Sequence, residues 1–204
     1  MTESKRPNYI ADAWLIIVLA ILFGVALAGT QMALGGRIAQ NKLNETVGLA
    51  HVLVPGAAEG KAEALMIKDQ AGRDVRVFKT FDAEGKQIGW LVPASGQGFA
   101  DKIEVVIGVD TQVTSITGIA VIDQKETPGL GDLITGEPFT SQYRGKSTSA
   151  ALGVVKTGPG KDNEIIALTG ATISSVAVTD IVNQQLAGVR EALLAALAAE
   201  PKGN

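Results

Sequence analysis

The stretch Leu168-Thr169-Gly170-Ala171-Thr172-Ile173-Ser174-Ser175 precedes an amphipathic run that ends near Leu197. Within this run, apolar residues recur at steps of three and four, at Val178, Ile181, Val182, Leu186, Val189, Leu193 and Leu197. The spacing predicts a long helix with one buried face that begins close to Thr172. Hydroxyl groups at a helix N-terminus lie beside unpaired N–H groups and the positive end of the helix dipole, which together favour a phosphate. Thr172 or Ser174 can equally be a simple N-cap.

A second stretch lies about 40 residues upstream, where Glu126-Thr127-Pro128-Gly129-Leu130-Gly131-Asp132 follows an apolar strand. Pro128 and the two glycines permit a tight backbone path with positive φ at Gly129 or Gly131. Such a loop can cover a flat ring, although a purely structural turn uses the same residues. Neither stretch is a P-loop, because no Gly-Lys-Ser/Thr follows the glycines.

The two stretches, in this order and spacing, resemble the FMN-binding domain family, and specifically the G subunits of Rnf electron-transport complexes. The related C subunit of the sodium-pumping NADH:quinone oxidoreductase shares this domain. The resemblance covers residues 45–190 approximately. It implies that a separate flavin transferase joins FMN through a phosphoester bond to Thr172, the last residue of the Thr-Gly-Ala-Thr motif. It also implies that the chain works with other subunits of a membrane complex.

The resemblance implies further cofactor-binding residues around Thr172. These are Thr169, Gly170, Ala171 and Ser174 near the phosphate, and Glu126, Thr127, Gly129, Leu130 and Gly131 beside the ring or ribityl chain. One position departs from the family pattern, which commonly has an aspartate three residues before the motif. Ile166 occupies that position here, and Asp162 and Glu164 are the nearest acids. Flavin attachment therefore depends on whether the transferase tolerates this change.

Composition narrows the functions that the chain can have. A chain of 204 residues with 46% hydrophobic content predicts one domain of ordinary size with a short appendage. The 18 basic and 21 acidic residues are spread along the chain, which argues against a nucleic-acid partner. The absence of cysteine excludes thiolate-ligated iron–sulfur clusters, and a single histidine, His51, excludes a multi-histidine metal site. Redox chemistry would need an organic cofactor, and no catalytic or metal-ligating residues are expected.

An uncharged run of 22 residues, Ala13 to Leu34, lies near the N-terminus. At about 1.5 Å per residue it is long enough to cross a hydrocarbon core of about 30 Å. We expect a transmembrane helix over residues 13–34, after a cytoplasmic tail of residues 1–12. A cleaved signal peptide is the alternative, since Ala26-Leu27-Ala28 resembles a cleavage site, but the apolar run exceeds a signal h-region.

The charges on the two sides of this run barely favour one orientation. The resemblance implies a bacterial inner-membrane protein whose C-terminal domain lies on the periplasmic, outer side. A connecting helix is expected over residues 35–50, and the FMN-binding domain over residues 51–200.

The remaining pattern predicts an α+β domain, with a mostly antiparallel sheet and the C-terminal helix packed on it. Strands are expected at 75–81, 88–92, 103–109, 113–122 and 164–168, short helices at 57–67 and 140–145, and turns or loops at 69–72, 94–99 and 158–162.

The function expected from the resemblance is that of an electron-carrier subunit of an ion-translocating oxidoreductase, which couples ferredoxin/NAD redox chemistry to ion translocation. A C-type subunit of the sodium-pumping NADH:quinone oxidoreductase is an alternative. A cofactor-free, membrane-anchored assembly module, in which the threonine motif is only a helix cap, is a rival from another class. A phosphate-ester hydrolase lacks support, because the sequence shows no metal-ligand cluster or nucleophile–base pair.

Overall fold

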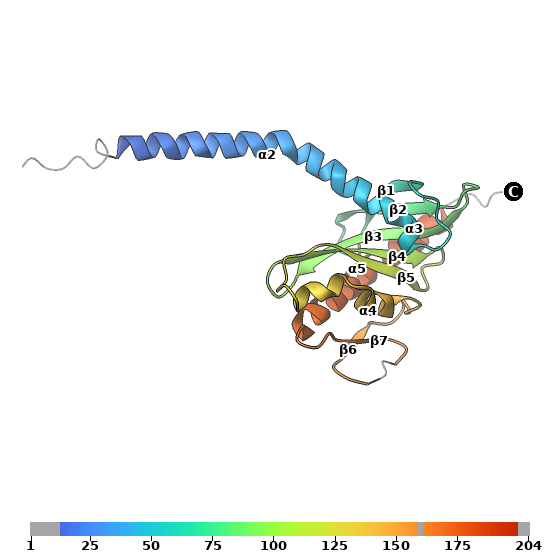
Figure 1. Ribbon diagram of the computed structural model, residues 1–204. Helices are drawn as coiled ribbons and strands as arrows, with labels where there is room; N and C mark the ends of the chain where they lie inside the picture. The colour runs from blue at the N-terminus through green and yellow to red at the C-terminus, as the bar shows by residue number, and fades with distance from the viewer. Residues whose placement is uncertain (1–12, 159–160, 200–204) are drawn as a thin grey trace, which may run out of the picture. The chain divides into compact units, whose positions relative to one another are not determined.

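The computed structural model describes residues 13–158 and 161–199, so the predicted tail over residues 1–12 and Pro159-Gly160 of the predicted turn lie outside the described residues. The chain divides into two compact units, one up to Asn44 and one from Glu45 onward. The first consists of most of helix α2, Trp14–Gly48 (Figure 1). Its apolar stretch is not buried by protein, and by length and composition it is the one described helix that could cross a membrane.

The second unit is built on a five-stranded antiparallel sheet whose strands are neighbours in chain order. The strands are β1 Ala62–Lys68, β2 Asp74–Phe81, β3 Gln87–Gln97, β4 Lys102–Asp110 and β5 Ile116–Asp123. Short connections join successive antiparallel strands. The long central pair, β3 and β4, is in register from Gly89↔Asp110 to Gln97↔Lys102.

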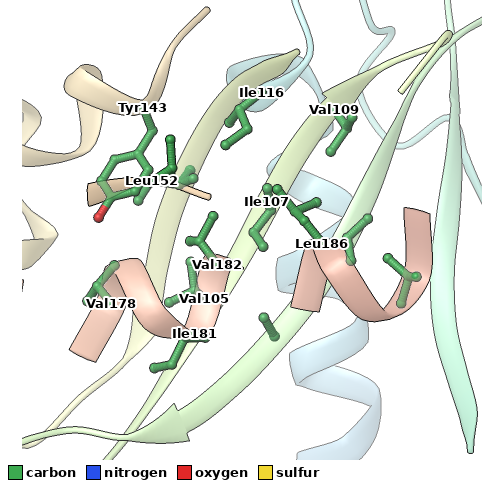
Figure 2. Close-up of a cluster of buried hydrophobic side chains, with 14 of the residues drawn as sticks. Val105, Ile107, Val109, Ile116, Tyr143, Leu152, Val178, Ile181, Val182 and Leu186 are labelled. Atoms are coloured by element: carbon green, nitrogen blue, oxygen red, sulfur yellow. The ribbon is translucent and has the colours of Figure 1, made fainter. Parts of the chain in front are cut away.

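Helix α5, Thr172–Ala198, covers one face of this sheet (Figure 1). Successive strand residues point to opposite faces, so Val105, Ile107 and Val109 of β4 all point toward α5. Figure 2 shows them in one cluster with Ile181, Val182 and Leu186 of α5. The predicted helical period is therefore the one that builds the core.

Short helix α3, Ala50–Leu53, lies on the opposite face of the sheet against β4 and β5. Gly108 faces this helix, and a Cβ added there would lie 2.7 Å from the carbonyl oxygen of Leu53. The glycine is needed because backbone approaches backbone at this point.

Between β5 and α5, the part of the chain that the structure describes contains only short elements. They are η1 Gly131–Thr135, α4 Glu137–Thr140, η2 Ser141–Tyr143, β6 Gly153–Val155 and β7 Glu164–Ile166, with β6 and β7 parallel. The buried Tyr143 hydroxyl lies 2.7 Å from Thr179 Oγ1 of α5, which fixes η2 to the core. Burial raises the pKa of the Tyr143 hydroxyl above its ordinary value.

The predicted α+β class, antiparallel sheet and packed C-terminal helix are confirmed, but four local predictions differ from the structure. The helix expected over residues 57–67 is wrong, because β1 pairs with β2 over seven residues there. The loop expected at 94–99 is strand up to Gln97. Strand β5 begins at Ile116 rather than 113, and the helix expected at 140–145 begins at Glu137.

We predict that Gly108→Ala destabilises the domain. Its Cβ would also lie 2.7 Å from Thr117 Oγ1, so α3 must shift, and overpacking of this kind typically costs about 1–3 kcal/mol. Thermal unfolding of the full chain in detergent, followed by near-UV circular dichroism, measures the effect. Gly153→Ala is the control, because its Cβ would meet nothing closer than 3.9 Å. Equal melting temperatures for the two variants would contradict the packing argument.

Candidate functional site

The two sequence motifs meet at one surface pocket with a volume of about 300 Å³. Thr127, Leu130 and Gly131 come from the Glu126–Asp132 stretch. The Leu168–Ser175 stretch contributes Gly170, Ala171, Thr172, Ile173 and Ser174, and the loop between β3 and β4 adds Phe99. Segments far apart in the chain thus form a single site at the N-terminus of α5.

The start of α5 leaves polar groups available to a ligand. The N-cap residue is Ala171, so the cap role considered for Thr172 or Ser174 is not what the structure shows. From Thr172 onward, the first backbone amide with a helical hydrogen bond is that of Ser175, which donates to the Ala171 carbonyl at 3.0 Å. Among the described residues, the Thr172 hydroxyl and the amides of Thr172, Ile173 and Ser174 have no hydrogen-bond partner. This is the donor arrangement that binds a phosphate group.

The walls of the pocket are apolar and open to solvent. Phe99, Leu130 and Ile173 are 60%, 45% and 61% exposed, respectively. Large apolar side chains grouped at a pocket rim indicate a ligand or partner surface. The pocket therefore combines a polar end at α5 with apolar walls that suit a planar ring.

Glu126 lies behind the pocket and is only 4% exposed. One carboxylate oxygen accepts a 2.6 Å hydrogen bond from Ser174 Oγ, and the other accepts one from the amide of Ala100 at 3.1 Å. A buried carboxylate needs such donors, because its desolvation is costly. Glu126 thus joins the Glu126–Asp132 stretch to the β3–β4 loop and to α5, and it does not itself line the pocket.

Two glycines make room for this carboxylate. A Cβ at Gly131 would lie 2.8 Å from the Cβ of Glu126 and 2.9 Å from Ser174 Oγ. A side chain at Gly98 would likewise overlap Glu126. Positive φ falls at Gly129, with φ of 75°, and at Gly170, with φ of 81°, whereas Gly131 is required for space.

The other predicted site residues occupy different places. Thr169 and Gly129 are exposed and do not line the pocket. Phe99 and Ile173 do line it, and neither is among the cofactor-binding residues named from the sequence, although the resemblance implies that the loop at 94–99, which contains Phe99, lies near the cofactor. The signal for both was an apolar residue next to a predicted loop or helix start, which is too common to single out.

Ile166 occupies the position where the family commonly has aspartate. Its backbone amide and carbonyl are both hydrogen-bonded to the side chain of Gln142. Its amide donates to Gln142 Oε1 at 2.7 Å, and its carbonyl accepts from Gln142 Nε2 at 3.1 Å. This pair fixes the strand that leads into the motif whatever side chain residue 166 carries. In the described part of the chain, no group of three or more His, Asp or Glu residues could hold a metal ion.

The fold and the pocket define an α+β ligand-binding domain with a phosphate-favouring helix start. The FMN-binding domain family matches residues 98–187, which include the whole pocket. The G subunit of the Na⁺-translocating ferredoxin:NAD⁺ oxidoreductase complex of Acetobacterium woodii is 30% identical over 182 residues, 84% of this chain and 87% of that protein. The G subunit of an ion-translocating oxidoreductase complex of Methanosarcina acetivorans is 28% identical, over 88% and 93% of the two chains.

The crystal structure of Shewanella oneidensis NqrC is similar in fold, with a TM-score of 0.58, 30% identity and coverage of 63% of each chain. The chain belongs to the FMN-binding domain family, among the G subunits of Rnf-type complexes.

We predict that the Glu126–Ser174 pair stabilises the junction of the two motifs. Ser174→Ala removes one of two donors to a buried carboxylate, which should lower the free energy of unfolding by about 1–3 kcal/mol. Glu126→Gln should cost less in the Ser174→Ala background than in the wild type, because the two residues share one interaction. Denaturant unfolding of the four proteins gives the coupling energy, and a value of zero would show that the pair is not a unit.

Proposed function

We propose that this chain is the membrane-anchored electron-carrier subunit of an Rnf-type electron-transport complex and that it carries FMN joined by a phosphoester bond to Thr172. The observation that carries the proposal is the pocket at the start of α5, which contains a threonine hydroxyl without a hydrogen-bond partner among the described residues. A hydroxyl already engaged as a helix cap would have to break that bond before it could be esterified.

The residues of the pocket suit the two ends of FMN. The free amides of Thr172, Ile173 and Ser174 would hold the phosphate, together with the positive end of the helix dipole. Gly170 lets the phosphate approach the backbone, while Phe99, Leu130 and Ile173 would contact the ring. Their apolar surfaces would remove one side of the ring from water.

The chemistry comes from the flavin, which accepts one or two electrons. The protein has to hold the group at a fixed place and needs no acid, base or nucleophile of its own. The Glu126 contacts to Ser174 and Ala100 supply this rigidity from behind the pocket.

The relatives support assembly into a multi-subunit complex, since those named above are subunits of ferredoxin:NAD⁺ or ion-translocating oxidoreductase complexes. On this basis we propose that the chain passes electrons between other subunits and that a flavin transferase matures it. Similarity to the C subunit of the Na⁺-translocating NADH-quinone reductase of Vibrio anguillarum extends over only 42% of this chain, which favours the G-type assignment over the C-type.

We further propose that α2 remains as an uncleaved membrane anchor and that the flavin domain lies on the periplasmic side of the bacterial inner membrane. The apolar part of α2 is unburied and long enough to span the bilayer, which supports the anchor. The orientation rests on the family resemblance.

We predict that Thr172→Ala abolishes covalent flavin while the domain stays folded. The substitution removes the attachment oxygen and breaks no protein hydrogen bond among the described residues, so stability should change by less than about 0.5 kcal/mol. Thr169→Ala is the matched control and should retain flavin, because Thr169 is exposed and outside the pocket. In-gel flavin fluorescence after denaturing electrophoresis is the measurement, on protein coexpressed with its own transferase.

A fluorescent Thr172→Ala band would refute the attachment site. If the wild-type band is not fluorescent and Ile166→Asp restores the fluorescence, then Ile166 is the residue that prevents flavin attachment. A dark wild type that Ile166→Asp does not restore, and that contains no tightly bound flavin in the native state, would favour the cofactor-free assembly module.

We predict that external protease digests the flavin domain in intact spheroplasts and leaves a membrane-embedded N-terminal fragment. A cytoplasmic marker protein that stays intact is the control for leakage. Full protection of the domain would place it on the cytoplasmic side. An intact mass for the membrane-extracted protein that begins at or after Gly29 would show that the apolar run is a cleaved signal.

A further inference from the structure

A second pocket, of about 260 Å³, lies between the middle of α5 and the loop that follows η2. It shares no residue with the FMN pocket. Arg190, Asn183 and Ala187 of α5 line one side, and the loop residues Ser147 to Leu152 line the other, with Gln70 at the edge. None of these groups has a part in the proposed electron-carrier function.

Arg190 is the charged group of this pocket, and among the described residues it has no partner. Its Nε is buried without a hydrogen bond, and its guanidinium forms no ion pair with any residue that the structure describes. Asp69, which borders α5 at Gly188, is already engaged, because its carboxylate accepts from Arg73 at 2.7 Å. The guanidinium charge therefore has no counter-ion among the described residues, and an anion in the pocket that Arg190 lines would supply one.

The loop opposite Arg190 adds neutral donors and is held rigidly. Ser147 Oγ and Ser149 Oγ lie 2.8 Å apart, which leaves hydroxyl capacity for a further partner. The amides of Ala150 and Ala151 have no hydrogen-bond partner among the described residues. Asn183 fixes the end of the loop through both polar atoms, to the Leu152 amide at 2.8 Å and its carbonyl at 2.9 Å.

We propose that this pocket is an anion site that binds the phosphoryl group of a small phosphate ester. The guanidinium and the loop donors line the same pocket, and a phosphoryl group has enough terminal oxygens to accept hydrogen bonds from both. The pocket has a volume of about 260 Å³, which leaves room for an organic group beside the phosphoryl group. Leu152, Leu186 and Ala187 would contact the organic part.

Equilibrium dialysis with radiolabelled inorganic phosphate tests the proposal on the full chain in a non-ionic detergent. The wild type should bind phosphate saturably, and Arg190→Gln should weaken the affinity at least about ten-fold. Phosphate at the start of α5 would survive this substitution, so the difference between the two proteins reports the Arg190 pocket alone. Arg76→Gln is the matched control, because it removes the same charge from an exposed position on β2 and should leave binding unchanged.

Ala187→Leu is a second variant, which fills the pocket from an exposed helix position and keeps Arg190. It should also abolish the Arg190-dependent binding, and circular dichroism checks that both variants are folded. Equal phosphate binding by the wild type, Arg190→Gln and Ala187→Leu would overturn the proposal. Displacement of phosphate by acetate at equal concentration would overturn the phosphoryl assignment.

Two sources of the phosphoryl group can be separated in the same dialysis. Displacement of the label by glycerol 3-phosphate supports the site and identifies a soluble ester. Displacement by lysophosphatidic acid at a much lower concentration also supports the site and identifies a phospholipid headgroup. Failure of both to compete would contradict a phosphate-ester site.

Discussion

The buried hydrogen bond between Ser174 and Glu126 is the constraint on which the pocket at the start of α5 depends. It joins a helix start to a loop 48 residues earlier in the chain, at a distance of 2.6 Å. The carboxylate of Glu126 is buried, and it is stable there only while its hydrogen-bond donors remain in place. If the loop moved away from the helix, this charge would be exposed to solvent or would stay buried without its donor. Gly98 and Gly131 are fixed by the same requirement, because any side chain there would occupy the space of Glu126.

Helix α5 serves the core and the pocket at once. Its buried residues, from Val178 to Leu193, pack on the sheet, and this packing fixes where the N-terminus of the helix points. Because the amides of the first turn have no partner among the described residues, a strongly packed helix presents unpaired donors at a defined position. The stability of the core thus pre-organises the binding site, without a flexible loop having to close over the ligand.

The spacing of apolar residues from Val178 onward predicted α5 and its buried face. The alternation of apolar and polar residues predicted most of the strands. Both patterns lie within a single short stretch of sequence, so they can be recognised without the tertiary structure. The strand β1 was missed because Ala-Glu-Ala-Leu-Met-Ile-Lys contains good helix formers, and only its pairing with β2 makes it a strand. Both motifs were recognised and they do meet. Glu126 lies behind the pocket and Phe99 lines it. Both placements depend on contacts between segments that are distant in the chain, so no single stretch of sequence predicts them.

Thr172 and Arg190 are eighteen residues apart on α5, which corresponds to about 27 Å along the helix axis. Charge on an anion at one end is screened over about 8 Å at physiological ionic strength, so direct electrostatic coupling between the two pockets is negligible. Any coupling would have to pass through the helix itself. Val178 and Val182 lie between the two pockets along α5, and their packing in the core holds this part of the helix against the sheet. The two sites are therefore independent in geometry and joined only by the packing that both require.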